Sequence, residues 1–311
     1  MRPAVAVDLG GTNLRAAFYP TGDIPATARE SRKTPSEAGP TAVLDEIHAA
    51  ISALDIASQY RAHMAIGIGA PGPLDASTGV VLHAPNLQGW NDVPLGPALA
   101  ERWGCPVYVQ NDANLAALGE WRFGAGRGAH HLIMLTIGTG IGGGVIVDDQ
   151  LLSGSRGLAG EIGHIPVMIG GPRCSCGQSG HLEAIASGTA IAEQVRRRGG
   201  LPGGDPGQEP TTEAIAHAAR RGDPVASEVL QAASVALGTA LAGLVHVFNP
   251  ERIVLGGGVS QAGAFFLDQI ERTLRASLMH PAFGGDLKVV PTALGDEAAL
   301  LGAVALVQAM S

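Results

Sequence analysis

The chain has 311 residues, of which 46% are hydrophobic, so we expect a large buried core and two domains. Its formal net charge at pH 7 is −8, with one basic run at residues 196–198, which argues against nucleic-acid binding through phosphate neutralisation. Three cysteines, no signal peptide and no apolar run of about 20 residues predict a cytoplasmic protein without a membrane partner.

The first predicted elements are two strands joined by a glycine turn. Residues 4–9 alternate as a strand, Gly10, Gly11 and Thr12 form the turn, and residues 13–18 return as a second strand. Asp8 stands just before the turn, where a carboxylate can hold magnesium while the turn amides bind phosphate oxygens. The same position also suits an aspartate that only forms the turn.

Helices are expected near residues 41–54, 95–103 and 113–121. Asn111 and Asp112 lie between a β-rich stretch and the third of these helices. An aspartate at this place is often a helix N-cap. It can also accept a proton from a substrate hydroxyl, which would make it a general base.

A second strand–turn–strand unit is predicted at residues 132–137 and 144–147, around Gly138-Thr139-Gly140. Because it repeats the first pattern, we expect an internal duplication. Residues 138–143 and 67–72 both match Gly-x-Gly-x-x-Gly, but neither match opens a helix, so both are poor dinucleotide fingerprints. The chain also lacks a lysine-containing P-loop, so phosphate would be bound by the backbone N–H groups of the hairpin turns and of a helix start.

Four potential metal ligands follow within a short glycine-rich segment. They are His164, Cys174, Cys176 and His181, a set that can close a tetrahedral zinc site. Glu161 and Glu183 flank the set, which suggests a pocket for a polar molecule beside the metal. The alternative is that these are two ordinary cysteines and two loop histidines, with no metal bound.

The remaining segments complete an α/β pattern. Helices are predicted at residues 188–198 and 224–248, with the basic run at the end of the first. A strand at residues 252–255 ends in three glycines and leads into a helix from about Ala262. Residues 199–210 are expected to form an exposed loop, and a last helix, 296–310, is expected to start with Asp296 as its cap.

Five motifs, in order along essentially the whole chain, resemble the ROK family of sugar kinases. They are Asp-Leu-Gly-Gly-Thr-Asn at 8–13, Asn-Asp-Ala-Asn at 111–114, Gly-Thr-Gly-Ile-Gly-Gly-Gly at 138–144, Gly-Glu-Ile-Gly-His at 160–164 and Cys-x-Cys-Gly-x-x-Gly-x-Leu-Glu at 174–183. The resemblance implies an α/β, two-domain actin-like (ribonuclease-H-like) ATPase fold with an interdomain cleft. The smaller domain would comprise residues 1–112 and 297–311, closed by the C-terminal helix. The larger domain, residues 113–296, would carry the zinc loop and the second phosphate loop.

The resemblance further implies ATP-dependent phosphorylation of a hexose at its 6-hydroxyl, with Asp112 as general base. ATP and Mg²⁺ would be bound by the glycine-rich segments, through Asp8, Gly10, Gly11, Thr12, Asn13, Thr139, Gly140, Gly142, Gly143, Gly256, Gly257 and Gly258. The sugar would be held by Asn86, Asn111, Asp112, Glu161, His164 and Glu183. A structural Zn²⁺ would be bound by His164, Cys174, Cys176 and His181. The family usually has a cysteine where His181 stands, and a neutral imidazole leaves the site less negative than a thiolate would.

Residues 84–90 resemble the glucokinase form of the family's sugar loop, so glucose is the expected substrate. The alternatives are N-acetylmannosamine or another hexose, or a non-catalytic, sugar-responsive regulatory protein. Such a regulator would keep Glu161, His164 and Glu183 but would not need Asp112. Polyphosphate could replace ATP on the same loops. The resemblance also implies a homo-oligomer, either a dimer or a tetramer.

Overall fold

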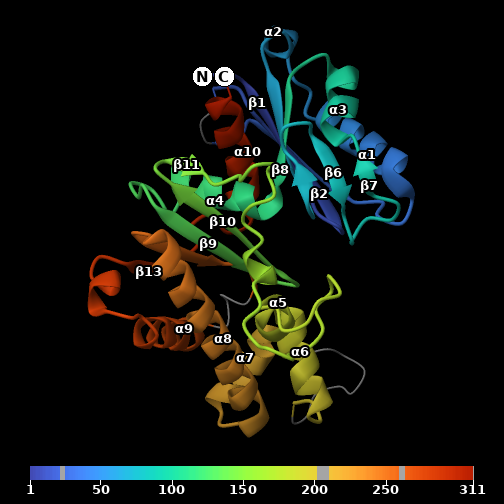
Figure 1. Ribbon diagram of the computed structural model, residues 1–311. Helices are drawn as coiled ribbons and strands as arrows, with labels where there is room; N and C mark the ends of the chain where they lie inside the picture. Colours follow the sequence, from blue (N-terminus) through green and yellow to red (C-terminus); the bar gives the residue numbers. More distant parts are fainter. Residues whose placement is uncertain (22–24, 202–209, 259–262, 311) are drawn as a thin grey trace. The chain divides into compact units, whose positions relative to one another are not determined.

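The computed structural model describes residues 1–21, 25–201, 210–258 and 263–310 (Figure 1). The chain divides into two compact units. Unit 1 consists of Met1–Gly128, Gln150–Gly160 and Ala293–Ser311, and unit 2 of Ala129–Asp149 and Glu161–Thr292. The first boundary lies later than the expected 112/113, because the helix that begins at Asp112 packs against the C-terminal helix of unit 1.

Unit 1 is built on a five-stranded sheet with the order β3-β2-β1-β4-β8. The strands are β1 (Ala4–Leu9), β2 (Asn13–Tyr19), β3 (Ala28–Lys33), β4 (Ala65–Ala70) and β8 (Val107–Asn111). β2 is antiparallel to both β1 and β3, whereas β1, β4 and β8 run parallel. The predicted first hairpin is therefore confirmed. A small sheet of β5 (Leu74–Asp75), β6 (Val80–His83) and β7 (Asn91–Val93) is attached.

The helices of unit 1 pack against this sheet. They are α1 (Gly39–Ala53), α2 (Ser58–Arg61), α3 (Leu95–Trp103), α4 (Asp112–Phe123) and α10 (Ala298–Ala309). α10 contacts β1 and β4, α1 contacts β2 and β3, and α3 contacts β8. The predicted last helix starts two residues late, since Gly295–Glu297 form a 3-10 turn, and Asp296 is not its cap.

The α4–α10 contact brings the two helix backbones together. A Cβ on Gly302 of α10 would lie 1.7 Å from the Leu115 carbonyl oxygen of α4. A Cβ on Gly67 of β4 would lie 2.4 Å from the Ala303 carbonyl oxygen of α10. Gly67 therefore makes room for a helix on a buried strand, which explains why the Gly67–Gly72 match is not a nucleotide fingerprint.

Unit 2 repeats the topology of unit 1. The strands of its sheet have the order β10-β9-β12-β13, with β9 (Leu132–Ile137), β10 (Ile141–Val147), β12 (Arg252–Gly256) and β13 (Lys288–Pro291). The two-residue strand β11 (Gln150–Leu151) belongs to the segment assigned to unit 1. β9 and β10 are antiparallel, and β9, β12 and β13 run parallel, as β1, β4 and β8 do. The structure thus supports the expected duplication. β10 starts at Ile141, earlier than the predicted residue 144.

The helical segments of unit 2 are η1 (Ile162–His164), α5 (Glu183–Ala186), α6 (Gly188–Arg197), α7 (Thr212–Arg220), α8 (Pro224–Phe248), α9 (Ala264–Ala276) and η3 (Pro281–Gly284). They gather around α8, which contacts α5, α6, α7 and α9, while η1 contacts β10. The predicted helices 188–198 and 224–248 are confirmed, and α7 was not predicted. Most of the predicted loop 199–210 and the predicted helix start at Ala262 lie outside the described residues.

Local sequence sets the ends of α8 and α6. Asp223 caps α8 by accepting a hydrogen bond from the Ala226 amide at 2.8 Å, with proline at the first helical position. α8 is long and apolar enough to cross a membrane, but 67% of its most apolar window is buried inside the protein, as in a core helix. The basic run ends α6, where Arg196 and Arg197 pair with Glu193.

Candidate active site

Three parallel strands of unit 1 end at one edge of the sheet. Asp8 of β1 lies in register with Gly69 of β4, which lies in register with Gln110 of β8. Two strand spacings of about 4.8 Å place the Asp8 and Gln110 backbones about 10 Å apart. Asp112 follows β8 almost directly, and its Cα lies 3.5 Å from the position of a Cβ on Gly69. Both predicted carboxylates of unit 1 therefore lie at this edge.

Asp112 is the first residue of α4, and Asn111 is the residue that caps this helix. Asn111 Oδ1 accepts hydrogen bonds from the backbone amides of Ala113 at 2.9 Å and Asn114 at 3.2 Å. The alternative N-cap role therefore belongs to Asn111, while Asp112 Oδ1 accepts a hydrogen bond from the Ala113 amide at 2.8 Å. The helix dipole favours an ionised carboxylate at the N-terminus, and ionised is the state that a general base requires.

The first glycine turn contacts the predicted sugar loop. The turn is closed by the Gly10 amide, which donates to the Asn13 carbonyl at 3.0 Å, and by the Thr34 hydroxyl, which donates to the Gly10 carbonyl at 2.7 Å. A Cβ on Gly11 would lie 2.9 Å from Asn86 Cβ. Asn86 is thus held directly against the turn that is expected to bind phosphate.

Two cations that we did not predict lie beside this turn. Arg15, in register with Asp8 across the hairpin, donates from Nε to Asp8 Oδ2 at 3.2 Å and forms an ion pair with it. Lys33, on β3, donates to Asn13 Oδ1 at 3.1 Å. The register of the predicted hairpin could have revealed Arg15. Lys33 could not be placed without β3, and it shows that a turn without a lysine motif still has a lysine nearby.

The predicted sugar loop, residues 84–90, is a compact turn. The Leu87 amide donates to the Ala84 carbonyl and the Ala84 amide to the Trp90 carbonyl, both at 3.1 Å. Trp90 is only 1% exposed and belongs to the hydrophobic core of unit 1. It therefore packs within its own unit.

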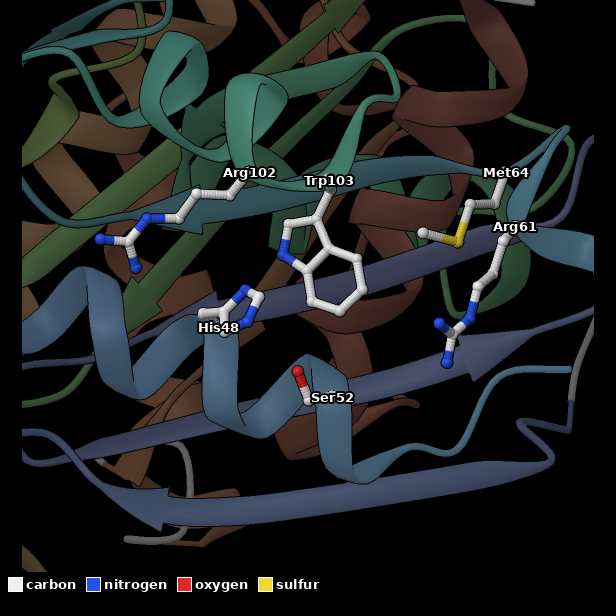
Figure 2. Close-up of a pocket in the computed structure, with 6 residues that line it drawn as sticks. All are labelled: His48, Ser52, Arg61, Met64, Arg102 and Trp103. Carbon is white, nitrogen blue, oxygen red and sulfur yellow. The ribbon is translucent and has the colours of Figure 1, made fainter. Parts of the chain in front are cut away.

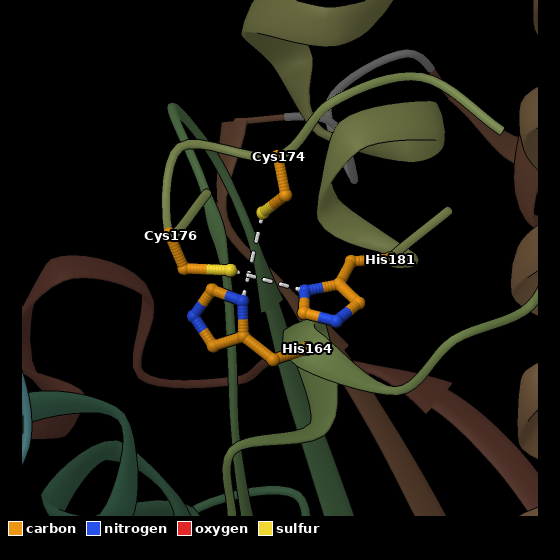
Figure 3. Close-up of side chains that lie close together, drawn as sticks. All are labelled: His164, Cys174, Cys176 and His181. Atoms are coloured by element: carbon orange, nitrogen blue, oxygen red, sulfur yellow. Dashed lines mark hydrogen bonds between the residues drawn. The ribbon is translucent and has the colours of Figure 1, made fainter. Parts of the chain in front are cut away.

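The four predicted metal ligands of unit 2 converge (Figure 3). His164 Nδ1 lies 3.6 Å from Cys174 Sγ, and His181 Nδ1 lies 3.2 Å from Cys176 Sγ. One ligand atom from each of the four residues lies within 4.8 Å of the others. A tetrahedral zinc ion with Zn–S of about 2.3 Å and Zn–N of about 2.0 Å requires N···S separations of about 3.5 Å. The arrangement therefore fits a metal ion with this ligand set.

The loop that carries these ligands is held by its own backbone. Isolated bridges pair Pro166 with His181 and Arg173 with Ser179, and the Cys174 amide donates to the Gln178 carbonyl at 2.7 Å. Cys174 is buried, and this burial raises the pKa of its thiol. A bound cation would reverse that effect, because it stabilises the thiolate.

The two predicted carboxylates of unit 2 differ in their surroundings. Glu161 Oε2 lies 3.9 Å from His164 Nε2, beyond hydrogen-bond distance. Burial raises the pKa of Glu161, with an opposing effect of His164 and a further increase from Glu183. Glu183 is engaged at both oxygens: Oε2 accepts from the Ile141 amide at 3.0 Å and Oε1 from the Ser175 hydroxyl at 2.9 Å.

The second glycine turn, Gly138-Thr139-Gly140, lies beside the third glycine run. The Gly138 amide donates to the Gly140 carbonyl at 2.9 Å, and the Gly188 amide at the start of α6 donates to the Gly138 carbonyl at 2.7 Å. Gly257 has a φ of 84°, and a Cβ there would lie 2.5 Å from the Ile137 carbonyl oxygen. Residues 256–258 thus adjoin the turn, whereas the predicted phosphate-loop residues Gly142 and Gly143 lie within β10.

A pocket elsewhere in unit 1 contains none of the predicted site residues (Figure 2). It is lined by His48, Ser52, Arg61, Met64, Arg102 and Trp103. Arg102 pairs with Asp45 at 2.7 Å, and Arg61 Nε donates to the Ile56 carbonyl at 2.9 Å. These contacts give both arginines structural roles, so the pocket is not a candidate for the active site.

The model of the ROK family matches residues 4–310. The chain belongs to the ROK family. A glucokinase from Thermotoga maritima is 38% identical over 316 residues, which cover 98% of this chain and 96% of that protein. The crystal structure of a ROK family glucokinase from Streptomyces griseus, in complex with glucose and AMPPNP, superposes with a TM-score of 0.82 at 36% identity and covers 99% of both chains.

The chain is also similar to a transcriptional repressor, but the match covers a smaller part of that protein. A xylose repressor from Caldicellulosiruptor bescii is 35% identical over 250 residues, which are 78% of this chain and 62% of the repressor. The full-length structural matches confirm the predicted fold class: the chain has the actin-like (ribonuclease-H-like) ATPase fold.

Proposed function

We propose that this chain is a sugar kinase that transfers the γ-phosphoryl group of ATP to the 6-hydroxyl of glucose. The supporting observation is the end of the first sheet where β1, β4 and β8 finish: Asp112 stands there at a helix N-terminus, and Asp8 lies at the same end, just before the first glycine turn. Identity to proteins named glucokinase over essentially the whole chain agrees with this arrangement. The complex of the Streptomyces griseus protein with glucose and AMPPNP agrees as well.

Asp112 acts as the general base in this proposal. Its carboxylate takes the proton of the 6-hydroxyl while that oxygen attacks the γ-phosphorus. The bond from the γ-phosphorus to the β–γ bridging oxygen breaks, and ADP leaves with the electron pair. Because such transfers depend mainly on positioning and charge, we expect the base to contribute about 10²–10⁴-fold to the rate.

The glycine turns are proposed to bind ATP through their backbone amides. In unit 1, residues 10–13 contact phosphate oxygens, and Asp8 holds magnesium once Arg15 shares or releases its carboxylate. In unit 2, Thr139 and Gly140 contact phosphate, and residues 256–258 approach the adenosine. Gly142 and Gly143 would assist from β10. The bound magnesium neutralises charge that develops on the phosphoryl oxygens.

The proposed sugar ligands are carboxylates, amides and one imidazole. Asn86, Asn111 and Asp112 belong to unit 1, and Glu161, His164 and Glu183 belong to unit 2. Carboxylates accept charge-assisted hydrogen bonds from the vicinal hydroxyls of a hexose. A sugar without one of these hydroxyls leaves an acceptor unpaired, which penalises its binding strongly.

The cluster of His164, Cys174, Cys176 and His181 is proposed to bind one structural Zn²⁺. Support comes from the four convergent ligand atoms, which leave no position for a reactive water. His164 would bind zinc through Nδ1 and direct Nε2, the atom nearest Glu161, toward the sugar. We also propose that the enzyme is cytoplasmic and forms a homo-oligomer, as the sequence suggested.

A coupled ATP assay over a panel of hexoses tests the function. We expect glucose to be phosphorylated best, N-acetylmannosamine poorly, and NMR to place the phosphate on the 6-oxygen. Replacing ATP with polyphosphate tests the donor. The second candidate function is that of a sugar-responsive regulator, and the similarity to a xylose repressor is the observation that supports it. Glucose binding without turnover on any sugar would support that alternative over the kinase.

A further inference from the structure

The carboxylate of Glu183 joins two segments that the proposed function treats separately. Its Oε2 accepts from the Ile141 amide, the first residue after the glycine turn 138–140, at 3.0 Å. Its Oε1 accepts at 2.9 Å from the hydroxyl of Ser175, which lies between the two metal-loop cysteines. Cys174 Sγ lies 3.6 Å from the same oxygen. All of these residues belong to unit 2.

The contact with the glycine turn is close and partly buried. Ile141 is 4% exposed, so its amide needs a protein acceptor. A Cβ on Gly140 would lie 2.5 Å from Glu183 Oε2, so the carboxylate occupies the space that a side chain at position 140 would need. The conformation of the turn therefore depends on where Glu183 is held.

The segment after the metal loop supports the turn from a second point. Gly188, at the start of α6, donates to the Gly138 carbonyl at 2.7 Å. Glu183 and Gly188 both follow His181 closely in the chain. A metal ion bound to His181 would therefore hold in place the start of the segment that makes both contacts with the turn. The hydrogen bond from Ser175 would hold the other carboxylate oxygen of Glu183.

We propose that Glu183 is a positioning residue that couples the metal loop to the second phosphate turn, so that zinc binding tightens nucleotide binding. The inference rests on the proposed function, since it requires the turn to bind ATP phosphates and the cluster to bind zinc. Binding free energies are reciprocal, so nucleotide would strengthen zinc retention by the same factor. Glu183 would then do more than bind sugar.

Three substitutions separate this role from others. Glu183→Ala removes both hydrogen bonds and leaves the Ile141 amide unsatisfied. Glu183→Gln keeps the bridge, because its amide oxygen can accept from Ile141 while its NH₂ group donates to the Ser175 hydroxyl. Ser175→Ala keeps the contact with the turn and weakens only the link to the metal loop.

The experiment is calorimetric titration of AMPPNP into each protein, zinc-loaded and after zinc removal with the chelator dialysed away. We expect stripping to weaken AMPPNP binding about tenfold in the wild type and in Glu183→Gln. Glu183→Ala should bind about tenfold more weakly when loaded, with no further loss on stripping. Ser175→Ala should bind normally when loaded and respond less to stripping.

Several results would overturn the coupling. One is a wild type that binds AMPPNP equally with and without zinc. Another is a zinc-loaded Glu183→Ala variant that binds AMPPNP as tightly as the wild type. A third is a Glu183→Ala variant that loses as much AMPPNP affinity as the wild type does when zinc is removed. A glucose titration of Glu183→Gln distinguishes the role of Glu183 in sugar binding from its role in coupling. Loss of the negative charge should weaken glucose binding and leave AMPPNP binding unchanged. A wild type that binds no AMPPNP would reject the proposed function, and this inference with it. If Glu183→Ala does not fold, the AMPPNP affinities of Glu183→Gln and Ser175→Ala before and after zinc removal still test the coupling.

Discussion

The Cβ of Asn86 lies 2.9 Å from the place that a Cβ on Gly11 would occupy, so the first glycine turn and the sugar loop are in direct contact within unit 1. Because real Cβ atoms do not approach so closely, a side chain at position 11 must displace one of the two segments. The nucleotide and sugar positions are therefore linked through this glycine.

Gly11→Ala should consequently impair both substrates. A displacement near 1 Å can cost about 10²-fold in rate, and we expect kcat/KM for glucose and for ATP to fall about 10- to 100-fold. Steady-state kinetics with each substrate varied would measure this. The control is Gly243→Ala, in α8, where a Cβ meets nothing within 4 Å. An unchanged kcat/KM for both substrates in Gly11→Ala would show that the contact does not matter.

Asp112→Asn should abolish turnover while glucose still binds. The amide keeps the shape of the side chain, and Asn111 still caps α4 through the Ala113 and Asn114 amides. Loss of a positioned base lowers kcat by about 10²–10⁴-fold. Turnover by the coupled assay and glucose affinity by calorimetry would be compared with the wild type. Turnover near the wild-type rate would exclude Asp112 as the base.

Gly302→Ala should destabilise unit 1, because its Cβ would lie 1.7 Å from the Leu115 carbonyl oxygen. Overpacking of this kind costs about 1–3 kcal/mol, against at most about 1 kcal/mol gained from helix propensity. Thermal unfolding should show a lower Tm for Gly302→Ala. Gly243→Ala, with open space, should raise it slightly. A Gly302→Ala variant as stable as the wild type would mean that α4 and α10 separate easily.

Features set by neighbouring residues could be predicted from the sequence. Both glycine hairpins follow from alternating strands around a turn, and α8 from Asp223 and Pro224 at its start. The four predicted metal ligands lie in one short segment of the sequence, so they could be recognised as a set without knowledge of the fold.

Features set by tertiary contact could not be predicted. β4 reads Ala-Ile-Gly-Ile-Gly-Ala, and the sequence alone does not reveal that Gly67 accommodates Ala303 of α10. Lys33 reaches the first turn only because β3 pairs with β2. The sequence suggested Glu183 as a sugar ligand, but its bonds to Ile141 and Ser175 depend on how the loop folds.

His181 stands where the resemblance to the ROK family implies a cysteine. We expect one zinc per chain, since His181 Nδ1 and Cys176 Sγ already lie 3.2 Å apart and the four ligand atoms converge. His181→Cys should retain zinc more tightly, because a neutral imidazole is exchanged for a thiolate whose negative charge stabilises the cation directly. His181→Ala should hold zinc more weakly, because three protein ligands no longer complete the four-coordinate set that a structural zinc site uses. Metal content by mass spectrometry, after dialysis at fixed free zinc, would rank the three proteins. We expect the highest zinc content in His181→Cys, a lower content in the wild type and the lowest in His181→Ala. A wild type that holds no more zinc than His181→Ala would show that histidine does not replace the cysteine here.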